Sequence, residues 1–139
     1  MALPPQKFRE VVVQMLFARA FFVAEESDLL PYFMEEHQAT KKAMGDALRR
    51  TQEVESHIEE LDQKIGPAST AFSLERIGKV ELSILRLGIY ELLYDKEVPP
   101  KVVLAEAVRL CRKYGTPGSA HFVNAVLDRI YKQDAAPTE

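Results

Sequence analysis

The chain has 139 residues, of which 47% are hydrophobic and 28% are charged. This length is typical of one domain and the composition is too apolar for a disordered chain, so we expect a single folded domain over residues 1–139. Cys111 is the only cysteine, which excludes an intramolecular disulfide, and no segment resembles a signal peptide or a membrane span. We therefore expect a cytoplasmic protein that does not enter membranes.

The net charge of −3 is unevenly distributed along the chain. Residues 25–62 carry eleven acids against four bases, whereas residues 99–133 carry six bases against two acids. A basic region favours an anionic partner such as RNA, but solvated helix faces give the same pattern. Charge alone leaves both interpretations open.

Apolar residues recur at intervals of three and four along almost the whole chain, and no stretch alternates with period two for long enough to predict a strand. We therefore predict an all-α fold. The first helix begins after Pro4 and Pro5. Its core stripe consists of Phe8, Val11, Val12, Met15, Leu16, Phe22 and Val23. A short second helix follows near residues 31–36, capped by Ser27 or Asp28.

The middle of the chain predicts one long polar helix and one buried helix. The polar helix runs from about Thr40 to Ile65, where Gly66 and Pro67 end it. A further segment opens near Ser73 and leads into residues 80–93, which are apolar around most of the circumference. We expect this segment to be the central, buried helix of the fold.

Two more helices complete the chain. Pro99 and Pro100 start a helix that Gly115 stops, and Thr116 or Ser119 caps the last helix. The tail over residues 133–139 is expected to be frayed.

No constellation of residues predicts catalysis. His37, His57 and His121 lie far apart, and none has a cysteine or carboxylate at zinc-ligand spacing. The glycines form no phosphate-binding loop and no nucleophile elbow. We therefore expect no catalytic residues, no metal, no cofactor and no enzyme activity.

The first helix carries a feature that favours RNA binding. Phe17 and Phe21 lie opposite its core stripe, with Lys7 and Gln14 beside them. An aromatic ring next to cationic and amide groups can stack on a nucleobase while the cation neutralises phosphate. A helix buried on two sides gives the same pattern. If a second copy of the chain covers this face instead, Phe17, Phe21 and Val13 would form the contact of a homodimer.

The start of the last helix is a second candidate. Free backbone N–H groups around Gly118, Ser119 and Ala120 can bind phosphate, although many helices share this feature.

Four segments match one known pattern in order and spacing. They are Leu74-Glu75-Arg76-Ile77 with Val80-Glu81, Ile84-Leu85-Arg86-Leu87 with Tyr90-Glu91-Leu92-Leu93, Val98-Pro99-Pro100-Lys101-Val102-Val103 leading to Glu106-Ala107, and Ser119 with Phe122-Val123-Asn124 and Val126-Leu127-Asp128. Together with Arg9-Glu10, Gln14 and Phe17, they resemble the NusB family of bacterial transcription antitermination factors.

The resemblance implies a NusB-like fold of about six to seven helices in two packed small bundles, without enzyme activity. It implies that the chain binds the boxA element of RNA as a heterodimer with the ribosomal protein NusE, within the RNA polymerase antitermination complex that supports rRNA transcription.

The resemblance and the two local features together predict contact residues. The residues expected to contact RNA, on one surface that brings both chain ends together, are Lys7, Arg9, Gln14, Phe17, Gly118, Ser119, His121 and Phe122. The residues that the resemblance places beside NusE are Glu75, Arg76, Lys79, Glu81 and Arg86.

Three departures from the family pattern favour a second function. Only Lys7 and Arg9 stand where the family has an arginine-rich N-terminus, His121 stands where a lysine is common, and Ala125 stands where a glycine is usual. Fewer phosphate contacts weaken RNA binding, which favours a protein-binding helical scaffold with the same fold and weak or lost RNA binding. The RNA-binding accessory domain of a methyltransferase fits less well, because 139 residues leave no room for a catalytic domain.

Overall fold

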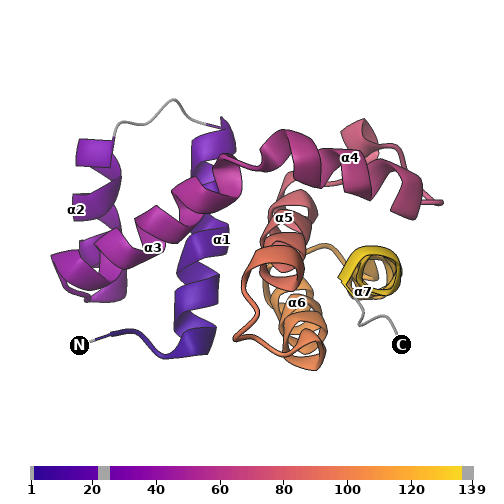
Figure 1. Cartoon of the computed structure of the whole chain (residues 1–139). Coiled ribbons are helices and arrows are strands. Elements are labelled where there is room, and N and C mark those ends of the chain that lie inside the picture. Colours follow the sequence, from indigo (N-terminus) through magenta and orange to yellow (C-terminus); the bar gives the residue numbers. More distant parts are fainter. Residues whose placement is uncertain (1, 22–25, 136–139) are drawn as a thin grey trace. The chain divides into compact units, whose positions relative to one another are not determined.

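A computed structural model describes residues 2–21 and 26–135 of the chain. Within these ranges every regular element is a helix, which confirms the all-α prediction. The chain divides into two compact units, Met1–Ser56 and His57–Glu139 (Figure 1). That the whole chain folds as one domain stays a prediction. No helix in the described ranges is long and apolar enough to cross a membrane.

The first unit consists of α1 (Pro5–Phe21), α2 (Glu26–His37) and α3 (Lys41–Glu55), with α3 packed on both others (Figure 1). The predicted stripe of α1 is buried at Val11, Val12, Met15 and Leu16, whereas Phe22 and Val23 lie outside the described residues. The second helix begins at Glu26, earlier than predicted. Burial of both Leu29 and Phe33 explains the extra turn, because packing of an apolar face stabilises helix that local sequence does not.

The long polar helix predicted over residues 40–65 is two helices. Thr40 caps α3 as predicted, accepting a hydrogen bond from the Ala43 N–H at 3.1 Å. The helix ends at Glu55, and α4 (Ile58–Ala68) follows. At the break, the Ser56 hydroxyl donates to the Glu53 carbonyl at 2.7 Å, a side-chain bond that competes with the helical backbone. This break coincides with the boundary between the two units.

Two other helix boundaries in this region differ from the predicted ones. The helix α4 continues through Pro67 to Ala68, where the buried Ala68 and a 2.9 Å hydrogen bond from the Ser69 N–H to the Ile65 carbonyl hold its last turn. A short 3₁₀ turn, η1 (Leu74–Arg76), precedes the next helix and is separated from it by two residues. The segment that opens near Ser73 is therefore not continuous with the buried helix.

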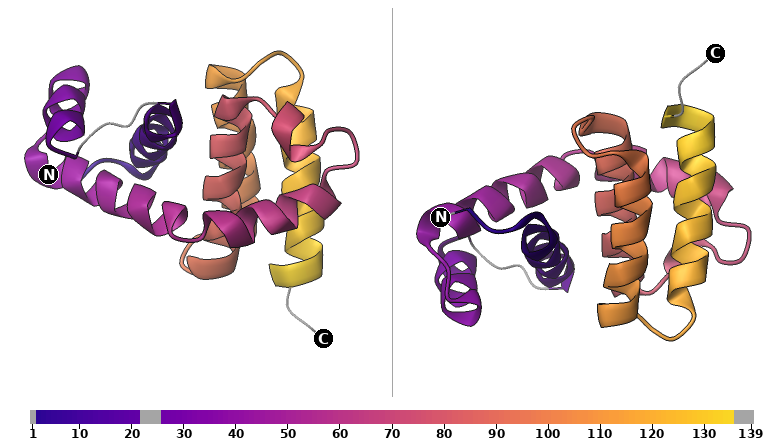
Figure 2. Two further views of the ribbon diagram at one scale, coloured as in Figure 1. Left: turned by 90° about the horizontal axis from the view of Figure 1, so that it is seen from above. Right: turned by 90° about the horizontal axis from the view of Figure 1, so that it is seen from below.

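The second unit is built around α5 (Lys79–Tyr94), which packs on α4, α6 (Pro100–Tyr114) and α7 (Ser119–Ile130). Figure 2 shows α5, α6 and α7 side by side, with α4 crossing them. From Glu81 to Leu92 every residue except Arg86 is buried, which confirms the predicted central helix.

The last two helices begin and end near the predicted residues. Gly115 ends α6 as predicted, but the residue that caps α7 is Gly118, whose φ of 85° is a left-handed conformation that glycine adopts without strain. A π-helical turn, η2 (Tyr131–Ala135), follows α7. In this turn, Oδ2 of Asp134 lies 3.5 Å from Nζ of Lys64 and forms an ion pair with it. The remainder of the expected frayed tail, residues 136–139, lies outside the described residues.

Candidate nucleic-acid interface

One face of α1 carries three of the predicted RNA contacts. Lys7, Gln14 and Phe17 are seven and three residues apart, so the helical repeat places them on the same side, and all three are half-buried. A cation, an amide and an aromatic ring thus lie on a single surface of the first unit. This is the arrangement predicted from the sequence, and its role in RNA binding stays a prediction.

Other residues of α1 are less accessible than the sequence suggested. Arg9 is 8% exposed and Glu10 is 6% exposed, so most of the Arg9 side chain is withdrawn from solvent. Val13, which was expected in a homodimer contact, is 3% exposed within the single chain, and the Phe21 side chain lies outside the described residues. The homodimer and the Arg9 contact stay predictions, with less surface to support them.

His37 contacts Gln14 on the face of α1 that carries Lys7 and Phe17, and no local pattern in the sequence predicts this contact. Its Nε2–H donates to Oε1 of Gln14 at 2.9 Å, and its ring stacks on Phe33 with centroids 5.7 Å apart. Burial, followed by the nearby charge of Lys7, lowers the pKa of His37 below its ordinary 6.5, against the opposite effects of Glu36 and Glu10. The imidazole is therefore neutral at pH 7. These partners are 23 residues apart, beyond the reach of any local motif.

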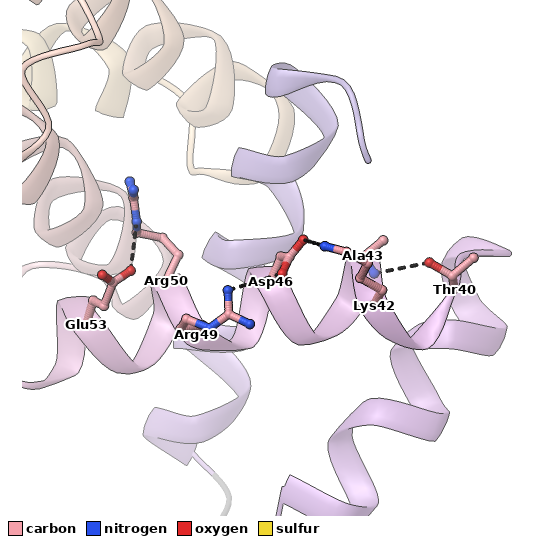
Figure 3. A network of polar contacts seen from close by, with 7 residues as sticks. All are labelled: Thr40, Lys42, Ala43, Asp46, Arg49, Arg50 and Glu53. Carbon is pink, nitrogen blue, oxygen red and sulfur yellow. Dashed lines mark hydrogen bonds and ion pairs between the residues drawn. The ribbon is translucent and has the colours of Figure 1, made fainter. Parts of the chain in front are cut away.

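Three of the four cations of α3 are already paired. Figure 3 shows the pairs Lys42–Asp46 and Arg49–Asp46, both at 3.2 Å, and Arg50–Glu53 at 3.3 Å. A hydrogen bond from Lys42 lowers the pKa of Asp46 despite the opposing effect of burial, and Arg49 adds to the lowering. This face of the acidic middle region is a set of intrahelical ion pairs, which makes it a weak candidate for phosphate binding.

The second unit contains a cleft of about 420 Å³ between the start of α5 and the turn before α7. Among the residues that line it are Arg76, Glu81, Gly118, Ser119 and Phe122. The cleft therefore brings together residues that the sequence assigned separately to RNA and to NusE. Phe72 also lines the cleft and is 47% exposed. Its ring packs edge-on against the ring of Phe122, with the ring centroids 5.2 Å apart. No periodic pattern marked Phe72 in the sequence.

Glu81 holds this cleft together. Its Oε2 accepts hydrogen bonds from the Thr116 N–H at 2.8 Å and from the Thr116 hydroxyl at 3.2 Å. A Cβ on Gly115 would lie 2.7 Å from the same oxygen, so glycine is required there. Burial acts to raise the pKa of Glu81, but hydrogen bonds from the Thr116 and Glu81 amides and from the Thr116 hydroxyl outweigh it, and the pKa lies below 4.5.

The five predicted NusE contacts fall into two groups. Glu75, Arg76 and Lys79 are exposed at or beside η1 and the start of α5. Glu81 is 5% exposed and bound to Thr116. Arg86 donates two hydrogen bonds to Asp62, at 2.8 and 2.9 Å, with 17% of its side chain exposed. Only the first group offers its charges to a partner; all five assignments stay predictions.

Among the described residues, the remaining candidate groups include neither a cluster of metal ligands nor an activated thiol. In the described part of the chain, no three His, Cys, Asp or Glu side chains are placed to hold a metal ion. Burial raises the pKa of the Cys111 thiol to about 11, which keeps it neutral and makes it a poor nucleophile. His121 is exposed on the first turn of α7.

Comparison with known proteins identifies the family. The model of the NusB family matches residues 6–132. The chain belongs to the NusB family. The transcription antitermination protein NusB of Geobacter sulfurreducens is 37% identical over 125 residues, covering 88% of this chain and 89% of that protein. The resemblance seen in the sequence is thereby confirmed.

Solved NusB structures share the fold. NusB of Thermotoga maritima superposes with a TM-score of 0.80 at 34% identity, covering 98% of this chain and 96% of that one. A chain from a crystal structure of antitermination factors NusB and NusE in complex with double-stranded RNA gives a TM-score of 0.77 at 31% identity, covering 91% of this chain and 95% of that one. The NusB-like fold predicted from the sequence is therefore confirmed.

Proposed function

We propose that this chain is a transcription antitermination adaptor that binds a boxA-type RNA together with the ribosomal protein NusE. It acts without catalysis, in the cytoplasm, as part of the RNA polymerase antitermination complex that supports rRNA transcription. The observation that carries the proposal is the family match over residues 6–132, joined to a relative of the same fold solved with NusE and RNA.

Each unit carries candidate binding groups of its own. In the first, α1 presents Lys7, Gln14 and Phe17 on one face. In the second, the left-handed Gly118 precedes the first turn of α7; the Ser119 N–H is bonded to the Thr116 carbonyl, and we assign phosphate to the backbone N–H groups that follow it. Glu75, Arg76 and Lys79, exposed near the same cleft, are the groups we assign to NusE.

The burial of Arg9 favours the alternative in one respect. With Arg9 only 8% exposed, Lys7 supplies most of the accessible charge at the start of α1. Each missing phosphate contact lowers affinity at physiological salt. We therefore expect RNA binding by the chain alone to be weak and to depend on NusE; a scaffold that binds NusE without RNA is the alternative.

The test is RNA binding by Phe17→Ala, measured by fluorescence anisotropy with NusE present at a fixed salt concentration. A boxA-like single strand and a duplex of the same sequence serve as ligands. If the Phe17 ring stacks on a base, its loss costs about 1–3 kcal/mol of binding free energy. Tyr32→Ala is the matched control, because Tyr32 is an exposed aromatic on α2 of the same unit.

The outcomes separate the two functions. Weakened binding by Phe17→Ala, with Tyr32→Ala unchanged, supports the adaptor and assigns RNA to this face of α1. If the unaltered chain with NusE binds neither RNA, the scaffold takes the adaptor's place.

A further inference from the structure

Phe72 is an exposed aromatic residue of the second unit that the RNA contacts predicted from the sequence do not include. It is 47% exposed, and the other large hydrophobic residues exposed in the described part of the chain are Tyr32, Tyr94 and Val102. None of these three is among the described residues that line the 420 Å³ cleft, whereas Phe72 is. Single exposed apolar residues are common on protein surfaces, so the place of Phe72 in this cleft carries more weight than its exposure.

The backbone of Phe72 is held by hydrogen bonds. Its N–H donates to Oγ of Ser69 at 3.4 Å, and the Ser69 hydroxyl donates to the Phe72 carbonyl at 2.5 Å. The loop begins after Ala68, the last residue of α4, whose carbonyl accepts a hydrogen bond from Nη1 of Arg129 at 2.7 Å. Because Arg129 belongs to α7, the loop that carries Phe72 is anchored to the helix that carries Phe122.

The rings of Phe72 and Phe122 form a right-angled corner in the cleft. Their planes are inclined at 83°, and Phe122 is half-buried. Phe122 covers Phe72 only in part, since 47% of Phe72 stays accessible. A planar base stacks on an accessible aromatic ring, and a ring that is already held in place loses little conformational entropy when it does so.

The charges of the cleft favour an anionic partner. Two charged residues line it, of which Glu81 is 5% exposed and bound to Thr116, whereas Arg76 is exposed. Gly118 lines the same cleft and precedes α7, whose N-terminus is the positive end of the helix dipole. An accessible aromatic ring in such surroundings suits a nucleotide, with its flat base and negative phosphate, better than an apolar peptide.

We propose that Phe72 is an RNA-contacting residue, on which one unpaired base of the boxA-type strand stacks beside Phe122. This inference rests on the proposed function and deepens it, because it gives the second unit a base-stacking residue of its own. Every base has a π-face, so Phe72 contributes affinity rather than a choice among bases. A duplex, whose bases are already stacked on one another, gains nothing from it.

Two variants of Phe72 and one control test the stacking. Phe72→Leu removes the aromatic face and keeps an apolar contact for Phe122, whereas Phe72→Trp keeps an aromatic face and is the rescue variant. Tyr94→Leu is the matched control, because Tyr94 is an aromatic of the same unit with 44% exposure. Binding is measured by fluorescence anisotropy with NusE present at fixed salt, for a boxA-like single strand and for a duplex of the same sequence.

We expect Phe72→Leu to bind the single strand about fivefold or more weakly, as the loss of one base stack allows. Phe72→Trp and Tyr94→Leu should bind it like the unaltered chain, and all variants should bind the duplex equally. An abasic nucleotide moved along the strand then locates the base. At one position it should weaken binding by the unaltered chain and cancel the effect of Phe72→Leu.

Phe72→Trp also supplies a direct signal, because the chain contains no tryptophan. A base stacked on the new indole should quench its emission when the single strand is added to the complex with NusE. The emission of NusE with the unaltered chain is subtracted, and Tyr94→Trp, which should not respond, is the control.

The outcomes distinguish this inference from the proposed function. If the unaltered chain with NusE binds neither RNA, the proposed function fails and the inference with it. If it binds the single strand and Phe72→Leu binds as tightly, or loses the same affinity for the single strand and the duplex, the stacking role alone is overturned. Quenching of Phe72→Trp by NusE without RNA would assign Phe72 to the protein partner and overturn the inference as well.

Discussion

The two units hold their candidate binding groups in different ways. In the first, a side chain positions a side chain: His37 binds Gln14 at 2.9 Å, while the backbone of α1 is an ordinary helix. In the second, a buried carboxylate positions the backbone: Glu81 binds the Thr116 amide at 2.8 Å and so fixes the turn before α7. The candidate binding groups therefore depend on a side-chain contact in the first unit and on a buried carboxylate in the second.

Ion pairs within one helix differ from ion pairs that join two helices. The pairs of Asp46 with Lys42 and Arg49 lie within α3 and are solvent-exposed, with 85% of the Lys42 side chain and 71% of the Arg49 side chain accessible. The pair of Arg86 and Asp62 joins α5 to α4, with less than a fifth of each side chain exposed. Exposed ion pairs contribute little to the free energy of unfolding, because water and salt screen them. Removing one partner of a half-buried pair that is joined by two hydrogen bonds lowers this free energy much more.

The largest effect is expected from Glu81→Lys. The substitution leaves the Thr116 N–H without its acceptor and puts a cation where an anion is buried, so the free energy of unfolding should fall by about 3 kcal/mol. Glu75→Lys is the matched control, because Glu75 is exposed on η1, and it should unfold like the unaltered chain. Urea titration followed by circular dichroism measures both.

The same pair of variants tests the NusE contact predicted from the sequence. Weaker capture of NusE by Glu81→Lys counts as a direct contact only if its unfolding free energy is unchanged. Equal stability of the two variants would show that Glu81 does not hold the turn.

Removal of the interhelical ion pair should have a smaller effect. Arg86→Gln leaves the half-buried Asp62 without a cationic partner, so we expect the free energy of unfolding to fall by about 1–2 kcal/mol. Arg49→Gln, which breaks an exposed pair of α3, should have no measurable effect. Losses of similar size in both variants would contradict the contrast between the two kinds of ion pair.

The smallest effect concerns pH. The pKa of His37 lies below its ordinary 6.5 and that of Glu81 below its ordinary 4.5, so in both cases the unfolded chain binds the proton more readily. Stability should therefore fall on acidification in two ranges, first from about pH 7 downward through the pKa of His37, and then from about pH 4.5 downward through that of Glu81. Chemical denaturation over this pH range measures the two losses.

Single variants assign each range to its group. His37→Gln should remove the first loss and leave the second, and Glu81→Gln should do the reverse. A first loss that persists in His37→Gln would contradict the assignment to this imidazole.

Local signals in the sequence determined the helical class, the family and several helix ends. Thr40 as a cap, the prolines before α6 and Gly115 after it act within one turn of the chain, so neighbouring residues suffice to predict them. The central helix was equally predictable, because an apolar run without a polar face must be buried. The match between four spaced segments and one family required no knowledge of packing.

Only the tertiary structure decided where the long polar helix predicted over residues 40–65 is broken and which charged residues are buried. The apolar pattern continues across Ser56 and His57, but the two sides of the break pack in different units. Arg9 and Glu81 are of residue types that usually lie at the surface, yet they are 8% and 5% exposed. The pairing of Gln14 with His37, and of Glu81 with Thr116, joins residues 23 and 35 positions apart. Helical periodicity says which way a residue faces on its own helix; which residue lies opposite depends on how the helices pack.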